Sequence, residues 1–136
     1  MTYTFKEDKQ IDKVALKSLY EDVEWYAYTK DLDGLAEALS HSLYVLSVWD
    51  NDELLGLVRV VGDGLTIIYI QDILVLNSRQ NQGLASEMMH RVLEKYHDVR
   101  QKVLLTEEAA DVRHFYEKHG FQSCDKGTLV AFAKLG

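Results

Sequence analysis

The sequence has few of the features that mark secreted or membrane proteins. It contains one cysteine, Cys124, so no disulfide can form within the chain, which fits a reducing compartment. No apolar run is long enough to span a bilayer, and the first residues lack the pattern of a signal peptide. Proline is absent altogether, which excludes no fold class. We therefore expect a cytoplasmic protein without a membrane partner.

Basic residues are also scarce: 15 Lys and Arg stand against 22 Asp and Glu, giving a net charge of −7. Such a chain is a poor electrostatic match for nucleic acid, so we expect no nucleic-acid partner. The five histidines are scattered without ligand spacing, and we expect no metal site. With 136 residues, 47% of them hydrophobic, the chain is long enough for one domain over residues 1–136 with its own core.

The most informative stretch runs from residue 66 to residue 96. Residues 66–76 are β-branched and apolar, as in a buried strand, and a polar turn follows over residues 77–82. After Gly83 the apolar residues recur at three- and four-residue spacing, which predicts an amphipathic helix with one buried stripe. That stripe consists of Leu84, Ala85, Met88, Met89, Val92, Leu93 and Tyr96.

A strand that leads through a turn into a helix N-terminus creates an anion site. The first amides of a helix have no partner within the helix, and the helix dipole favours negative charge there. Gly83 leaves room for a ligand, and Asn81 tolerates a positive φ better than other non-glycine residues. Arg79 and Gln80 add donors at the rim. Two other phosphate motifs are absent, since there is neither a Gly-Lys-Ser/Thr sequence nor a three-glycine dinucleotide fingerprint.

The remaining patterns predict an α+β fold with a mixed sheet and helices on both faces. Asp8 can cap a first helix whose inward residues are Ile11, Val14, Ala15, Leu16 and Leu19. Asp31 or Asp33 opens a second helix that ends near residue 41, and Gly120 ends a helix over residues 108–119. We expect strands over residues 1–6, 43–49, 54–61, 66–76 and 102–106, and a last hairpin of residues 121–124 and 128–135.

Two motifs on this framework resemble those of the GCN5-related N-acetyltransferase (GNAT) family. Gln80-x-x-Gly83-x-Ala85 after a strand is similar to the family's pyrophosphate loop, and residues 115–121, Phe-Tyr-Glu-Lys-His-Gly-Phe, are similar to its late motif. The order of elements matches along essentially the whole chain. The resemblance implies a centrally splayed sheet. Two positions depart from the family pattern, because Asn77 stands where proline is common and Ala109 where an asparagine often contacts the cofactor.

The resemblance implies that acetyl-coenzyme A is the co-substrate, and it assigns cofactor contacts on both sides of the turn. In the family, a bulge in the preceding strand frees backbone groups for pantetheine and the acetyl carbonyl, which here maps to Ile73, Leu74 and Val75. The pyrophosphate would be held by the amides of Gln80, Asn81, Gln82, Gly83, Leu84, Ala85 and Ser86, together with the Gln80 side chain.

Two residues are candidates for proton transfer. Tyr116 lies in the late motif, and its phenol, with an ordinary pKa of about 10, can donate to the departing thiolate; alternatively it is a core aromatic beside Phe115. Asp72 is the polar exception in an apolar strand. It could bind the amine or accept its proton, directly or through water, or it could face solvent or pair with a structural partner such as Arg59.

These observations predict an acetyl-coenzyme A-dependent N-acetyltransferase that acts on a primary amine of a small molecule in a ternary complex. In this fold the acceptor pocket lies near the first two helices, where Glu24, Trp25, Tyr26 and Tyr28 are the candidates to contact the amine. The same segment could instead be a hydrophobic plug. The alternative functions are a non-catalytic acyl-coenzyme A-binding module and acetylation of a protein or peptide amine. The sequence leaves open whether the chain forms a homodimer.

Overall fold

A computed structural model describes residues 3–136. Its contacts divide the chain into two compact units, one ending at Leu105 and the other beginning at Thr106, and each is described by itself. That the whole chain forms a single domain stays a prediction. Within residues 3–136 every helix is too short or too polar to cross a bilayer.

The first unit is built on a mixed five-stranded sheet, which confirms the predicted α+β class. The strands follow the order of the sequence, and only the last pairing is parallel. They are β1 (Thr4–Lys6), β2 (Tyr44–Asp50), β3 (Glu53–Gly62), β4 (Ile67–Val75) and β5 (Gln101–Val103). The predicted first strand is confirmed for Thr4–Lys6, and residues 1 and 2 lie outside the described part of the chain.

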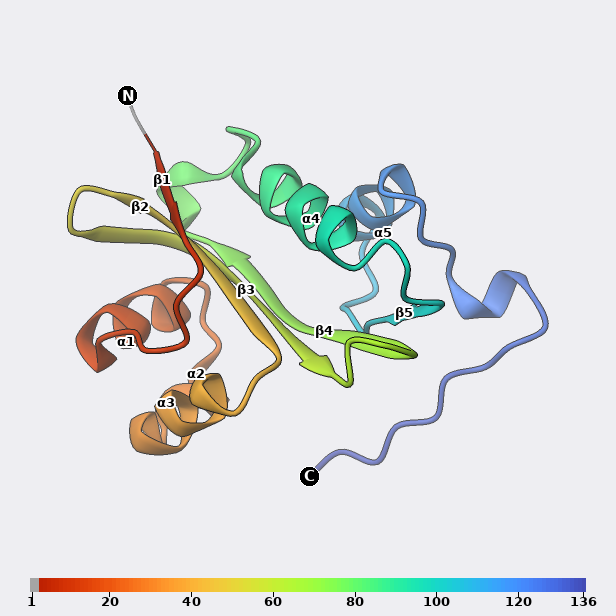
Figure 1. The fold of residues 1–136 in the computed structure, drawn as a ribbon, viewed down its shortest axis with the longest axis horizontal. Helices are drawn as coiled ribbons and strands as arrows, with labels where there is room; N and C mark the ends of the chain where they lie inside the picture. The colour runs from red at the N-terminus through yellow and green to blue at the C-terminus, as the bar shows by residue number, and fades with distance from the viewer. Residues whose placement is uncertain (1–2) are drawn as a thin grey trace. The chain divides into compact units, whose positions relative to one another are not determined.

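Helices cover both faces of this sheet, as predicted (Figure 1). Three of them, α1 (Lys13–Asp22), α2 (Tyr26–Thr29) and α3 (Leu32–Ser40), lie on one face, and α4 (Leu84–Lys95) lies on the other. The apolar residues of α1 and α3 pack onto the strands because they recur at helical spacing on one side of each helix. The resulting core cluster contains Leu16, Leu19, Tyr20, Leu35, Leu39, Val45, Leu54, Leu57 and Leu74.

The predicted cap of the first helix is wrong, whereas that of the next long helix is confirmed. Asp12, not Asp8, precedes α1, and its carboxylate accepts a hydrogen bond from the Ala15 amide at 3.2 Å. A helix that begins at Lys13 turns Val14 outward, and this side chain is 74% exposed. Asp31 caps α3 by accepting from the Gly34 amide at 2.9 Å.

The sheet opens along β4. Only Ile67–Tyr69 pair with β5, so the edge of β4 from Gln71 to Val75 has no partner strand within residues 3–136. On the other side β4 pairs with β3, and the register shifts so that Gln71 is an extra residue between two pairs, Arg59 with Asp72 and Val60 with Ile70. The expected splay is therefore present, but the bulge lies at Gln71.

The second unit contains α5 (Ala110–Lys118), and Gly120 follows it with a φ of 90°. This agrees with the predicted glycine at the end of the helix. The predicted hairpin of residues 121–124 and 128–135 is wrong. A 3₁₀ turn over Cys124–Lys126 is the last regular element in the described chain. A strand exists only where another strand completes its hydrogen bonds, and residues 128–135 have no such partner in this unit.

Candidate active site

The loop between β4 and α4 has the backbone conformation that its sequence predicts. A 3₁₀ turn over Asn77–Arg79 follows the strand, and Asn81 then adopts a positive φ of 63°. Gly83 is left-handed, with φ 81° and ψ 6°, and directly precedes α4. The Gly83 carbonyl accepts from the Glu87 amide at 2.9 Å, so the helix begins here. The polar turn thus ends the strand, and Gly83 sets the direction in which α4 begins.

The space in front of this helix N-terminus fits an anionic group. A Cβ built on Gly83 would meet no heavy atom within 4 Å, so its Cα borders open space. The first amides of α4 have no carbonyl partner within the helix, and the helix dipole adds partial positive charge. This combination fits the pyrophosphate of coenzyme A, the group that the sequence motif implies.

Side chains that were expected to add donors at the rim instead hold the loop in place. The Arg79 guanidinium lies 3.2 Å from Asp50 and 3.3 Å from Glu53, both in the hairpin of β2 and β3. The Gln80 amide donates to the Val75 carbonyl at 3.2 Å and to the Asn77 side chain at 3.1 Å. Both side chains are thus engaged within the protein, and the main-chain amides at the start of α4 are the donors left to the proposed pyrophosphate site.

Asn77 fastens the start of the loop to the end of α1. Its amide donates to the Asp22 carboxylate at 2.7 Å, and its side chain donates to the Asp22 carbonyl, also at 2.7 Å. Proline, the residue that the family pattern often has at this place, has neither a main-chain N–H nor a side-chain amide and could make neither bond. The departure from the family pattern at residue 77 thus has a structural role.

The three predicted contacts on β4 lie at its open edge. Ile73, Leu74 and Val75 pair regularly with β3, without a bulge among them. Along a strand, successive residues direct their N–H and C=O groups to opposite edges. Part of this backbone is consequently presented to the side that β5 does not cover. Backbone groups of Ile73–Val75 lack a partner strand on this side because β5 ends at Val103. The β-bulge in β4 lies at Gln71, two residues before Ile73.

Asp72 is the centre of a buried polar cluster. It is 2% exposed, and its Oδ2 accepts from the Arg59 guanidinium at 2.8 Å and from the Tyr20 hydroxyl at 2.9 Å. Its Oδ1 accepts from the Tyr28 hydroxyl at 2.6 Å, and that hydroxyl in turn accepts from Gln71 at 2.9 Å. Burial, followed by the charge of Asp72, raises the pKa of Tyr20 well above its ordinary value.

This cluster joins α1, α2 and two strands beside the Gln71 bulge. Of the alternatives open for Asp72, the ion pair with Arg59 is the one present. Tyr20 was not among the site residues predicted from the sequence. One signal could have found it: a buried carboxylate needs donors, and Tyr20 is a polar-tipped residue in the apolar stripe of α1.

We expect Asp72→Ala to lower the free energy of unfolding by about 3–5 kcal/mol, because it leaves the Arg59 guanidinium buried without its counter-charge. Denaturant unfolding measures this loss. The double variant Asp72→Ala/Arg59→Met should recover part of it, since no charge then remains buried. Asp33→Ala, which breaks an exposed ion pair with Lys13, is the control and should cost far less. Equal losses of unfolding free energy in Asp72→Ala and Asp33→Ala would contradict the assignment of Asp72 as the buried counter-charge of Arg59.

The predicted acceptor segment divides into packed and exposed residues. The Trp25 ring lies 6.1 Å from Tyr20 and 6.3 Å from Tyr28, both measured between ring centroids, and packs against the core cluster. Glu24, with a φ of 64°, and Tyr26 are exposed. The segment therefore has features of both a hydrophobic plug and an acceptor pocket. The rings of Trp25 and Tyr28 anchor it to the core, and the side chains of Glu24 and Tyr26 are accessible to a ligand.

Tyr116 lies in the second unit, among aromatic rings. Its ring centroid is 5.1 Å from that of Phe115 and 5.9 Å from that of Phe121, both in edge-on arrangements. Burial raises the pKa of Tyr116 above its ordinary value. The phenol consequently keeps its proton at neutral pH, as a general acid must.

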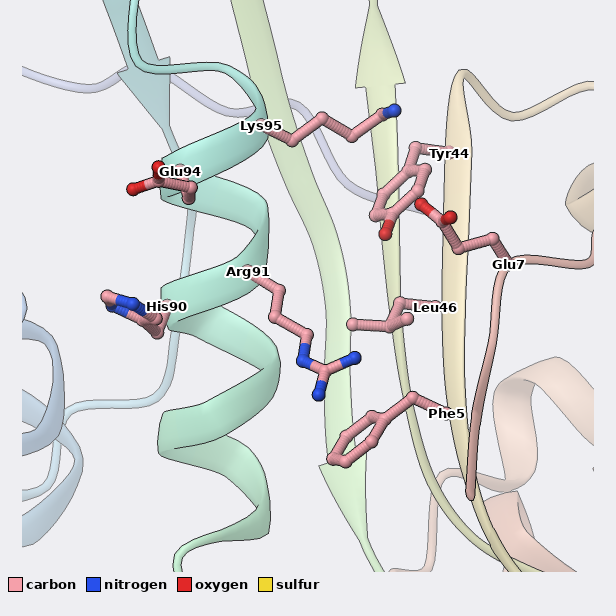
Figure 2. Close-up of a pocket in the computed structure, with 8 residues that line it drawn as sticks. All are labelled: Phe5, Glu7, Tyr44, Leu46, His90, Arg91, Glu94 and Lys95. Carbon is pink, nitrogen blue, oxygen red and sulfur yellow. The ribbon is translucent and has the colours of Figure 1, made fainter. Parts of the chain in front are cut away.

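A separate hollow of about 460 Å³ lies between α4 and the strands β1 and β2 (Figure 2). Arg91 reaches from α4 over the Phe5 ring, 3.9 Å from its centroid, and also pairs with Glu87 at 2.9 Å. Lys95 lies 5.0 Å from the centroid of Tyr44. Because both cations are already engaged, and no predicted site residue lines this hollow, we assign it no ligand.

Comparisons with known proteins agree with this geometry. The family model described as an acetyltransferase (GNAT) domain matches residues 7–132. A GNAT-family acetyltransferase from Streptococcus pneumoniae is 31% identical, with a TM-score of 0.87 over 99% of this chain and 98% of its own. A probable acetyltransferase from Staphylococcus aureus is 24% identical, with a TM-score of 0.78 over 98% and 100%.

A third structure has the same fold at 12% identity, with a TM-score of 0.67 and full coverage of both chains. It is AAC(6′)-Iy in complex with the bisubstrate analogue CoA-S-monomethyl-acetylneamine. No protein with a curated description matches the chain. The family model and the streptococcal relative together establish that this chain belongs to the GNAT family of acetyltransferases.

Proposed function

We propose that this protein transfers the acetyl group of acetyl-coenzyme A to a primary amine of a small molecule, directly and within a ternary complex. The observation that carries the proposal is the left-handed Gly83 before α4, which leaves open space in front of the first helix amides. The half-free edge of β4 supports it, since it offers backbone groups to the rest of the cofactor. Acetyl-coenzyme A supplies an activated acyl group as its thioester.

The chain's own residues bind and orient the two substrates. The amides at the start of α4 would hold the pyrophosphate, and backbone groups of Ile73–Val75 would align the pantetheine arm and the acetyl carbonyl. Such alignment lowers the barrier, because a positioned amine and thioester react as if in one molecule.

Proton transfer requires an acid for the thiolate and an acceptor for the amine proton. Tyr116 is the proposed acid, and its raised pKa keeps the phenol protonated. Asp72 is the proposed anionic group near the amine. Because both of its oxygens already accept hydrogen bonds, it would act through the Tyr28 hydroxyl or a water molecule rather than by direct contact.

The proposed acceptor side is aromatic and acidic. If Trp25 and Tyr28 line the acceptor pocket, as we propose, their ring faces would attract an ammonium group, which is worth roughly 0.5–2 kcal/mol. Glu24 and the net charge of −7 also favour cations. We therefore expect a small cationic amine, aromatic or polyamine-like, rather than an anionic sugar phosphate. The complex of AAC(6′)-Iy with the bisubstrate analogue CoA-S-monomethyl-acetylneamine supports the proposal of a small-molecule acceptor.

Trp25→Ala should raise the KM for the amine and leave the KM for acetyl-coenzyme A nearly unchanged, because we propose that this residue contacts the acceptor and not the cofactor. Steady-state kinetics with each substrate varied in turn would measure both constants. Trp49→Ala is a matched control, since Trp49 packs against the same core cluster from β2. If the two variants change both constants alike, Trp25 is part of the hydrophobic plug.

The decisive test is release of free thiol from acetyl-coenzyme A across a panel of amines. Release with small cationic amines supports the proposal. Coenzyme A binding without release for any amine would identify a non-catalytic module, and release only with peptides would identify a protein acetyltransferase. Anionic acceptors alone would contradict the proposed pocket.

A further inference from the structure

The loop of residues 77–83 between β4 and α4, here called the cofactor loop, is fastened to the rest of the first unit in two places. Its first half, residues 77–80, is held by the hydrogen bonds and ion pairs described above. Its second half, residues 81–83, makes one side-chain hydrogen bond within the described part of this unit. In that bond the Tyr3 hydroxyl donates to Gln82 Oε1 at 2.6 Å, across 79 positions of the sequence.

The second half of the cofactor loop has a backbone that needs such support. Asn81 has a φ of 63° and Gly83 a φ of 81°, so Gln82 lies between two left-handed residues. Within the first unit the amides of residues 81–83 donate to no acceptor, which leaves them available to the proposed pyrophosphate. Uncommon backbone angles persist where surrounding structure holds them. The bond from Tyr3 supplies that hold at Gln82.

Tyr3 is itself placed by the strand that follows it. Phe5 of β1 pairs with Val48 of β2. On the other side of β1, the Arg91 guanidinium of α4 lies 3.9 Å from the centroid of the Phe5 ring (Figure 2). The strand directly after Tyr3 is therefore held by both the sheet and α4, the helix whose first amides border the proposed pyrophosphate site.

We propose that Tyr3 is a positioning residue for the cofactor. Its hydroxyl holds Gln82 so that the amides of residues 81–83 are already arranged for the pyrophosphate before coenzyme A binds. The inference rests on the proposed function, because it takes this loop as the pyrophosphate site. Tyr3 acts through Gln82 and contacts neither substrate. It raises affinity because a loop that is ordered in advance loses less conformational freedom on binding.

The test is calorimetric titration of the full chain with coenzyme A. Tyr3→Phe keeps the ring and removes the hydroxyl, and it should raise the Kd by roughly three- to tenfold, as expected for the loss of one hydrogen bond. Tyr69→Phe is the matched control, since it removes the hydroxyl of another partly buried tyrosine, on β4, and should leave the Kd unchanged. The midpoint of thermal unfolding should be similar in both variants, so a general loss of stability cannot account for the difference in Kd.

A double-mutant cycle tests whether Tyr3 acts through Gln82. Gln82→Met removes the side-chain amide and keeps the main-chain N–H of residue 82. It should also raise the Kd for coenzyme A, and adding Tyr3→Phe to it should raise the Kd no further, because the two groups form a single bond. Independent, multiplying increases in Kd would contradict the proposed route through Gln82.

The same titrations separate this inference from the function on which it rests. If the wild type does not bind coenzyme A, the proposed function and the role of Tyr3 are both overturned. If the wild type binds and the folded Tyr3→Phe protein binds equally well, only the role of Tyr3 is overturned, and the cofactor loop keeps its proposed assignment. A selective loss of affinity in Tyr3→Phe, absent from Tyr69→Phe, supports the inference.

Discussion

Gly83→Val is expected to weaken binding of coenzyme A by at least about a hundredfold, or ~2.7 kcal/mol, while the protein stays folded. Gly83 has a φ of 81°, which a β-branched residue adopts only with strain, so the backbone in front of α4 would shift. The new methyl groups would also occupy the open space that we assign to the pyrophosphate. Isothermal titration calorimetry with coenzyme A measures the loss directly.

Gly120→Val is the matched control for this experiment. Gly120 has a φ of 90°, and a Cβ there also meets open space, but it follows α5 and lies outside the loop. Left-handed backbone costs about 1–2 kcal/mol for an ordinary residue, so both variants should lose similar stability. Only Gly83→Val should lose affinity. Unchanged affinity in a folded Gly83→Val protein would end the assignment of the loop to pyrophosphate.

Tyr116→Phe is expected to lower turnover by roughly 10²–10⁴-fold with little change in affinity for acetyl-coenzyme A, because only the phenolic proton is removed. Single-turnover kinetics isolate the chemical step. Tyr96→Phe removes a phenol from the end of α4 and should leave turnover intact. Wild-type turnover in Tyr116→Phe would instead identify residue 116 as a core aromatic beside Phe115.

The pH dependence of turnover provides a second check on Tyr116. Burial raises its pKa, so the phenol stays protonated above its ordinary value of about 10. A general acid is active in its protonated form, and turnover should therefore persist to pH 10 and fall only above it. If the fall in turnover above pH 10 is present in the wild type and absent in Tyr116→Phe, it reports the deprotonation of Tyr116.

The part of the site that the sequence predicted best is the part that local patterns determine. The apolar run of β4, the positive φ of Asn81 and the glycine before α4 all follow from neighbouring residues. The helix stripe depends on a single period, and it placed Met88, Met89 and Val92 correctly in the core. One of the two family motifs, Gln80-x-x-Gly83-x-Ala85, also lies within this stretch.

Features that depend on distant partners were predicted less well. Asp8 and Asp12 both precede apolar residues, and only packing of Leu16 and Leu19 on the sheet decides which one caps α1. The bulge at Gln71 accompanies the pairing of Asp72 with Arg59 across two strands. Tyr20 reaches a carboxylate 52 positions away in the sequence. No local pattern records such contacts.

The predicted C-terminal hairpin also depended on a partner that the local sequence does not specify. Residues 128–135 have strand-forming composition, and the prediction from local propensity was reasonable. β-propensity, however, expresses how well a residue fits against neighbouring strands, and it does not specify which strand the neighbour is. The structure supplies no partner within the second unit, so the segment remains without regular structure.

The two hydrogen bonds between Asn77 and Asp22 make the orientation of the loop a tertiary property. A proline would stiffen the loop through its own ring, independently of the rest of the fold. Here the stiffness comes from the last turn of a helix 55 positions earlier. When the end of α1 frays, as helix ends do in local unfolding, the loop loses its anchor in the same event. Cofactor affinity and the stability of α1 are thus coupled quantities in this protein.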